Sequence, residues 1–236
     1  MKNIHSKFRF GKRATLILRA VLCVVVLSLT TVGPVYSQFK DDSGGRRLKT
    51  PLGDIAFEVV GQVSNLSPTD SKQYGYLSLV NGLDTNQIFT SSNPTMQNEA
   101  TALFTFFTDA VTERVIANGR LRIINRTGTT TIYFDETPDG TFSNRNTFSD
   151  GQPVLVLKYR QQVILDTADT TFTVVNLLTV ESAEYFVIDG ESLRLGKNRD
   201  HFRQFYSGAP PTGTHALNGV FAGYAVAIEP AKPNQD

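Results

Sequence analysis

The side chains best suited to chemistry gather in one segment near the C-terminal end, residues 197–215. Four of them can form hydrogen bonds or carry charge: His201, Arg203, Tyr206 and His215. Because loops often carry binding groups on a rigid scaffold, we predict that this segment is a ligand-binding surface. If it closes over a barrel mouth, Arg203 and His201 can orient an acid or carbonyl group of an apolar ligand. An ordinary long connection between strands is the alternative interpretation.

The two histidines of this segment could also flank a metal ion. A metal site needs further ligands at set distances, and no such set accompanies His201 and His215. A calcium loop needs oxygen ligands at alternating positions, a series that residues 135–139 do not supply. The sequence therefore predicts no metal site and no cofactor.

Motifs of common enzyme classes are absent from the chain. It contains no Gly-x-Gly-x-x-Gly, no phosphate-binding Gly-Lys-Ser/Thr loop, no Gly-x-Ser-x-Gly and no His-Glu-x-x-His. Three aspartates that could act in acid–base chemistry, Asp166, Asp169 and Asp189, lie in turn sequences, where local hydrogen bonding explains an aspartate. The residues leave open whether the protein is an enzyme.

The first 37 residues have the order of a secretory signal peptide. A basic region without acidic residues precedes an apolar run over 20–29, and Val35-Tyr36-Ser37 offers a small-residue cleavage site. We predict cleavage after Ser37 and a secreted or periplasmic location. An uncleaved anchor is disfavoured because the run is shorter than the ~20 residues that span a bilayer. A lipoprotein site at Cys23 is disfavoured because a bulky leucine precedes it.

Charge and cysteine content narrow the class of protein further. Six of the 23 Lys and Arg residues precede residue 38, which leaves 17 against 22 Asp and Glu, a net charge of about −5. An acidic chain without a basic block is a poor candidate for binding nucleic acid. The single cysteine lies in the predicted signal, so the mature domain has no disulfide and must be stabilised by its core.

After the signal we predict a flexible leader (38–50), one all-β domain (51–230) and a polar tail (231–236). The stretch Val154 to Leu195 is densest in β-branched and aromatic residues, which favour strands. The predicted strands are 55–63, 73–80, 100–108, 120–125, 129–135, 154–166, 170–180, 183–188, 191–195 and 218–228, with a short one possible at 87–90 and 111–117 undecided between strand and helix.

Short Gly-containing sequences predict the turns between these strands. Asn118-Gly119 and Asp189-Gly190 are hairpin signals, and we interpret 125–128 as a further hairpin turn. We predict that the segment 196–217 is the longest irregular part of the second half of the chain. In the last strand, Gly219 and Gly223 indicate a bend or close packing, as at a barrel corner.

The fold class that follows is all-β, an antiparallel barrel of about eight to ten strands, with a two-sheet sandwich as the alternative. We favour the barrel because consecutive strands follow through short turns and closure removes exposed edges. The plan is similar to that of small secreted barrels such as lipocalins and the dirigent or allene-oxide-cyclase type. The similarity concerns architecture alone, since the lipocalin Gly-x-Trp signature is missing and no residue roles are transferred.

The functional expectation is a barrel that binds a small apolar or amphipathic ligand, with the many Phe and Tyr residues as core or as pocket wall. One alternative is an enzyme of isomerase or cyclase type, which would need Arg, His or Tyr in the cavity. Another is a surface interaction or structural domain without ligand. An outer-membrane barrel is disfavoured, because strands such as 100–108 lack clean apolar–polar alternation. The oligomeric state stays open.

Overall fold

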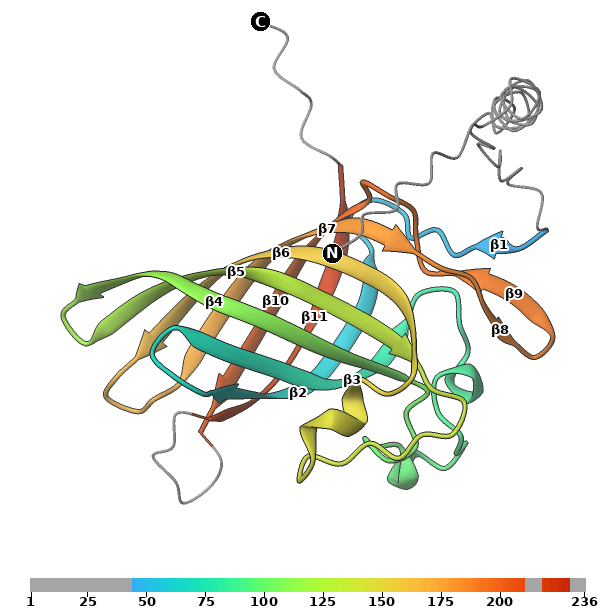
Figure 1. Cartoon of the computed structure of the whole chain (residues 1–236), viewed down its shortest axis with the longest axis horizontal. Helices are drawn as coiled ribbons and strands as arrows, with labels where there is room; N and C mark the ends of the chain where they lie inside the picture. Colours follow the sequence, from blue (N-terminus) through green and yellow to red (C-terminus); the bar gives the residue numbers. More distant parts are fainter. Residues whose placement is uncertain (1–43, 211–217, 230–236) are drawn as a thin grey trace, which may run out of the picture. The chain divides into compact units, whose positions relative to one another are not determined.

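The structure, a computed structural model, describes residues 44–210 and 218–229. Eight antiparallel strands form a closed barrel, which confirms the predicted fold class (Figure 1). The predicted signal peptide (1–37) and polar tail (231–236) lie outside the described residues.

Each strand of the barrel pairs with a neighbour on both sides. In spatial order the strands are β10 (His201–Ala209), β11 (Gly219–Ile228), β2 (Ile55–Asn65), β3 (Asp70–Val80), β4 (Phe104–Asn118), β5 (Leu121–Phe134), β6 (Gln152–Asp166) and β7 (Phe172–Ala183). The pairing of β10 with β7 closes the ring.

Within residues 44–210 and 218–229, one small sheet and three short 3-10 helices lie outside the barrel. The sheet contains β1 (Arg46–Arg47), β9 (Glu191–Arg194) and β8 (Phe186–Ile188), and the 3-10 helices are η1 (Thr85–Gln87), η2 (Pro94–Met96) and η3 (Arg145–Phe148). A search of the described residues finds no helix with the length and hydropathy needed to cross a membrane.

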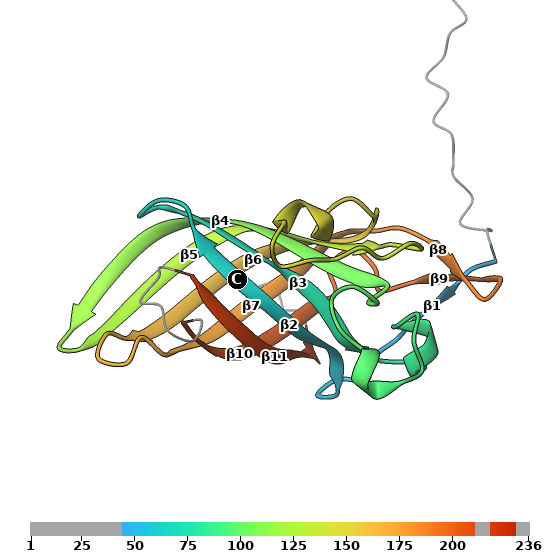
Figure 2. The same ribbon diagram turned by 90° about the horizontal axis from the view of Figure 1, so that it is seen from below.

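The two ends of the barrel differ in their connections. Short turns after β2, β4 and β6 lie at one end, which we call the short-turn end. The connections from β3 to β4, from β5 to β6 and from β7 to β10 lie at the other, which we call the long-loop end. Figures 1 and 2 both show β8, β9 and β1 at the end opposite the tip of the β4–β5 hairpin.

Buried side chains fill the barrel at the long-loop end. Phe104, Phe134 and Phe186 form a ring cluster with centroid separations of 5.1–5.4 Å. Leu48 and Leu193 belong to the same buried core. The long connections thus contribute side chains that close this end of the barrel.

The middle of the barrel is packed as well. Alternation along the strands directs Phe57, Phe106, Leu157 and Phe221 inward, and all four are buried. The cavity that they help to line has a volume of only about 10 Å³, close to that of a single water site. Most of the aromatic residues are therefore core, which leaves the short-turn end as the place for a pocket inside the barrel.

Strands occupy described residues of two segments that were predicted as a turn and as irregular, and these predictions were wrong. The hairpin turn expected at 125–128 is the middle of the continuous strand β5, which pairs with β4 and β6 throughout. Gly128 allows β5 and β4 to lie close together there, since an added Cβ would lie 1.9 Å from the carbonyl oxygen of Asp109. The segment 196–217, expected to be irregular, contains the nine-residue strand β10.

Other turn and packing signals are confirmed. Asp189 and Gly190 have φ angles of 53° and 79°, the left-handed conformation that a two-residue hairpin between β8 and β9 requires. Gly223 meets β10 so closely that an added Cβ would lie 2.0 Å from the carbonyl oxygen of Phe205. The undecided segment 111–117 is strand, whereas 87–90 contributes one isolated bridge at Phe89.

The structure describes part of the segment predicted as a flexible leader, residues 44–50. There β1 pairs in parallel with β9, and Leu48 is buried with an exposed fraction of 8%. The Arg46 side chain donates to the Glu191 carboxylate at 2.5 Å, an exposed ion pair. This part of the chain packs on the fold.

Candidate functional site

A group of polar side chains is buried inside the barrel, at the boundary between its packed middle and the short-turn end. Tyr206 of β10, Gln73 of β3, and Tyr159 and Gln161 of β6 all face inward, and each is at most 5% exposed. Polar side chains buried to this extent require hydrogen-bond partners. We call these four residues the interior polar cluster.

The cluster satisfies its groups internally. Gln161 Nε2 donates to the Tyr206 hydroxyl at 2.5 Å, and that hydroxyl donates to Gln73 Oε1 at 2.6 Å. Gln73 Nε2 donates to the Tyr159 hydroxyl at 2.8 Å. The chain of bonds links β3, β6 and β10 across the interior and fixes the orientation of each side chain.

Burial sets the protonation state of the two phenols. Desolvation raises the pKa of Tyr206 and raises that of Tyr159 well above the usual value near 10. Both hydroxyls therefore stay protonated at neutral pH and keep an O–H that can donate.

Arg126 of β5 lies beside this cluster with its guanidinium inside the barrel. Nη2 donates to Asn65 Oδ1 at 2.8 Å, and Nε and Nη1 make longer contacts to Thr112 Oγ1 (3.3 Å) and Gln161 Oε1 (3.4 Å). All three acceptors are neutral. Among the described residues, no carboxylate forms an ion pair with Arg126. Desolvation lowers the pKa of Arg126, which marks the guanidinium as a cation in an unfavourable environment.

Arg126 and three residues of the cluster, Gln73, Gln161 and Tyr206, line a pocket of about 160 Å³ at the short-turn end. The apolar side chains around it come from four strands: Val63, Ile124, Val163, Leu165, Phe172 and Val174. The polar side chains that line it include Asn65, Gln73, Arg126, Gln161 and Tyr206. The pocket thus offers mainly apolar walls and several polar groups, one of them cationic, an arrangement suited to an amphipathic molecule.

Comparison of the chain with protein-family models, with curated proteins and with solved structures finds no match in any of the three. The site must be interpreted from its own geometry.

The four ligand-binding residues predicted from the sequence lie in different environments. Tyr206 faces the interior and lines the pocket. Arg203, three positions earlier on β10, is exposed on the outer face. His201 lies at the start of β10, where its Nδ1 is 2.7 Å from the carbonyl oxygen of Arg199, beside an outer hollow lined by Leu48. His215 lies outside the described residues.

The sequence did not point to the other pocket residues. Arg126 falls in the segment that the sequence predicts as a turn. Gln73 and Gln161 lie in predicted strands, where a single polar residue gives no sign that it faces inward. One signal was available: in the segment from Leu157 to Leu165, Gln161 holds the same strand face as Tyr159 and Val163, so a polar group interrupts an apolar face.

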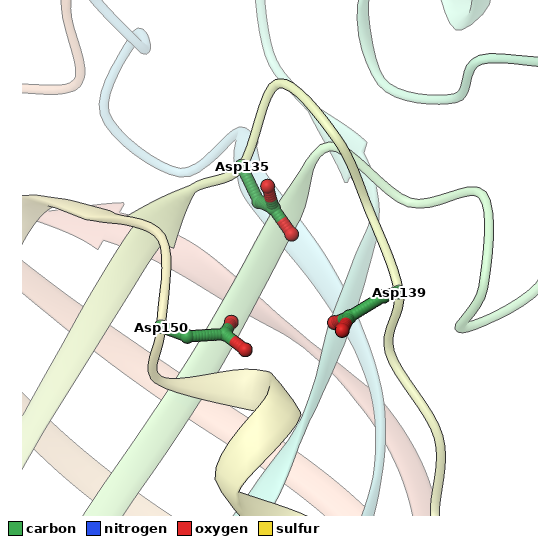
Figure 3. Close-up of side chains that lie close together, drawn as sticks. All are labelled: Asp135, Asp139 and Asp150. Carbon is green, nitrogen blue, oxygen red and sulfur yellow. The ribbon is translucent and has the colours of Figure 1, made fainter.

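A second group of titratable side chains lies at the long-loop end. One carboxylate oxygen from each of Asp135, Asp139 and Asp150 lies within 4.8 Å of the others, all in the connection between β5 and β6 (Figure 3). Burial, and then the neighbouring carboxylates, raise the pKa of Asp150. Asp135 and Asp139 lie in the first part of this connection and Asp150 lies at its end, so sequence spacing alone did not connect them. Exposed carboxylates of this kind are common in proteins that hold no ion there.

Proposed function

We propose that this protein is a β-barrel that binds a small apolar or amphipathic molecule in the pocket at the short-turn end. The observation that supports the proposal is the contrast inside the barrel. Its middle is packed to a residual cavity of about 10 Å³, whereas the short-turn end holds a pocket of about 160 Å³ with mainly apolar walls.

The size of the pocket limits the ligand. An apolar cavity of about 150 Å³ in a protein interior accommodates benzene. Pockets for drug-sized ligands have volumes of about 300–1,000 Å³. The buried part of the ligand is therefore about as large as one six-membered ring or a short branched chain.

Two neighbouring residues of β6 allow a matched test. Val163 faces the pocket and is buried, whereas Ile164 faces outward and is 39% exposed. We expect Val163→Phe to fill the pocket and abolish uptake of small apolar molecules, and Ile164→Phe to leave uptake unchanged. Leu165→Phe, at a half-buried pocket position, is a second filling variant should Val163→Phe fail to fold.

Nuclear magnetic resonance titration of the labelled protein with a panel of small apolar acids, amides and alcohols measures this directly. The proposal predicts that amide signals of pocket residues such as Val174 and Gly219 shift, and that the filling variants lose the shifts. A panel without any shift, or shifts that persist in both filling variants, would contradict it and favour a surface interaction or structural domain.

A second candidate is an enzyme of isomerase or cyclase type that uses the same pocket. The observation in its favour is that Arg126 lines the apolar pocket, where its guanidinium could donate to an oxygen that gains negative charge. No histidine or carboxylate of the described residues lines this pocket, so catalysis would rest on shape and electrostatics. Recovery of a bound molecule chemically unchanged after incubation supports binding alone, and recovery of an isomer supports the enzyme.

The location that we propose, secreted or periplasmic, rests on the order of residues in the segment 1–37. N-terminal sequencing of the protein recovered from its host tests it. A mature chain that begins at Gln38 is expected, and an intact Met1 terminus on cytoplasmic protein would contradict the proposal.

A further inference from the structure

The charge inside the pocket is unbalanced. Arg126 is inside the barrel, and its hydrogen bonds go to the neutral oxygens of Asn65, Thr112 and Gln161. The titratable groups that act electrostatically on it are the phenols of Tyr159 and Tyr206, and both are protonated at neutral pH. The described part of the fold thus provides a half-buried cation, and no carboxylate of that part forms an ion pair with it.

Such an arrangement is unfavourable for the empty barrel. A charge moved from water into a protein interior is costly unless a counterion and hydrogen bonds compensate for it. A glutamine or methionine at position 126 would fill similar space without this cost. The position therefore suits a partner that arrives from outside and brings negative charge.

The groups around Arg126 can bind a carboxylate. A guanidinium has five N–H donors in a planar fork, and it binds carboxylates through two parallel hydrogen bonds. The Gln161 amide lines the same pocket, and the second N–H of its Nε2 can add a further hydrogen bond. One cation among apolar walls matches a single negative charge on an apolar body better than a doubly charged, strongly hydrated anion.

We infer that the ligand of this pocket is a small apolar carboxylic acid in its ionised form, with the carboxylate on Arg126 and the apolar part against Ile124, Val163 and Phe172. This inference rests on the proposed function, because it names the chemical class of the molecule that the pocket binds. The inference adds to the proposed function that Arg126 makes the pocket prefer negatively charged ligands.

The test compares acids with neutral molecules of the same shape. Benzoate, cinnamate and octanoate are each titrated beside benzamide, cinnamamide and octanamide, with binding followed by nuclear magnetic resonance. For the wild-type chain, at least one acid is expected to bind about tenfold or more tightly than its amide, the effect of one charge-assisted hydrogen bond. Arg126→Gln is expected to abolish this preference and to keep amide binding.

Arg160→Gln is the matched control. Arg160 lies on the neighbouring strand β6, where it pairs with Thr127, but its side chain is exposed on the outer face. The same loss of one positive charge there is expected to leave the acid preference unchanged. Amide binding also reports that the Arg126→Gln barrel is folded.

The outcomes separate the two claims. Equal affinities for acids and amides in the wild type, or an acid preference that survives Arg126→Gln, would overturn the acid inference and leave the binding barrel standing. Failure of every probe to bind the wild-type chain would overturn both. If Arg160→Gln loses the acid preference to the same extent as Arg126→Gln, the preference comes from general surface charge, which would also overturn the inference.

Discussion

Arg126 and Asn65 meet across the interior of the barrel. Nη2 of Arg126 donates to Oδ1 of Asn65 at 2.8 Å, although β5 and β2, which carry them, are separated in the barrel by β3 and β4. The bond therefore spans the short-turn end, and it fixes the direction of the guanidinium at the pocket wall.

This relationship predicts the effect of a carboxylate placed beside Arg126. Asn65→Asp should form an internal ion pair with the guanidinium and compete with an acidic ligand, which weakens acid binding about tenfold or more. Amide binding should be unchanged. Asn125→Asp is the control, because Asn125 Oδ1 accepts from Arg114 at an exposed site. Equal acid affinity in Asn65→Asp and wild type, by titration, would show that Arg126 does not hold the acid.

The hydroxyl of Tyr206 should stabilise the fold measurably. Tyr206→Phe removes the acceptor for Gln161 Nε2 and the donor to Gln73 Oε1, which leaves buried amide groups unpaired. We expect the free energy of unfolding to fall by about 1–3 kcal/mol, measured by chemical denaturation. Tyr224→Phe, at a position 43% exposed, should have little effect. A similar small effect at both positions would mean that the cluster is not a stabilising network.

The buried phenols should also make stability depend on alkaline pH. Burial raises the pKa of Tyr159 and Tyr206 in the folded state above the value near 10 of the unfolded chain. The stabilisation is fully present below about pH 10, and it is lost as the pH rises above that value toward the folded pKa. Ultraviolet titration should show two phenols that ionise only when the protein unfolds at alkaline pH. In Tyr206→Phe, one such phenol should remain. Ionisation of all tyrosines near pH 10 in the folded protein would contradict this.

Close approach of β10 and β11 at Gly223 should make that position intolerant of a side chain. A Cβ there would lie 2.0 Å from the carbonyl oxygen of Phe205 and 2.4 Å from Cβ of Tyr206, so the backbones must separate. We expect Gly223→Ala to destabilise the protein by about 1–3 kcal/mol in thermal unfolding. Gly44→Ala, where nothing lies within 4 Å of the added Cβ, should be neutral. An unchanged melting temperature for Gly223→Ala would show that the two strands are not packed this closely.

The barrel could be predicted because its strands carry local signals. Alternation in β6 and β7 and the positive-φ dipeptide Asp189-Gly190 depend on neighbours in the chain, and these predictions are confirmed. Gly128 was misinterpreted because a glycine that permits close approach of another strand looks the same in sequence as a glycine in a turn. β10 was missed because its inward residues include Gln204 as well as Phe202 and Tyr206, which weakens the apolar alternation.

The pocket was only partly predictable for a different reason. Tyr206 was chosen because it lies near other polar residues in the chain, but the register of β10 directs Arg203 outward. Arg126, Gln73 and Gln161 come from three strands, and strand pairing alone brings them together. A polar residue on an inward strand face becomes informative once the inward face is known.

The most direct test of the proposed function is native mass spectrometry of the protein purified from its own host. A binding barrel predicts one small apolar molecule bound per protein chain. This molecule should be present in Ile164→Phe and absent from Val163→Phe. If the bound molecule is an acid, the result would also agree with the role of Arg126. An apo mass for the wild-type protein, without uptake from the panel of acids, amides and alcohols, would contradict the account.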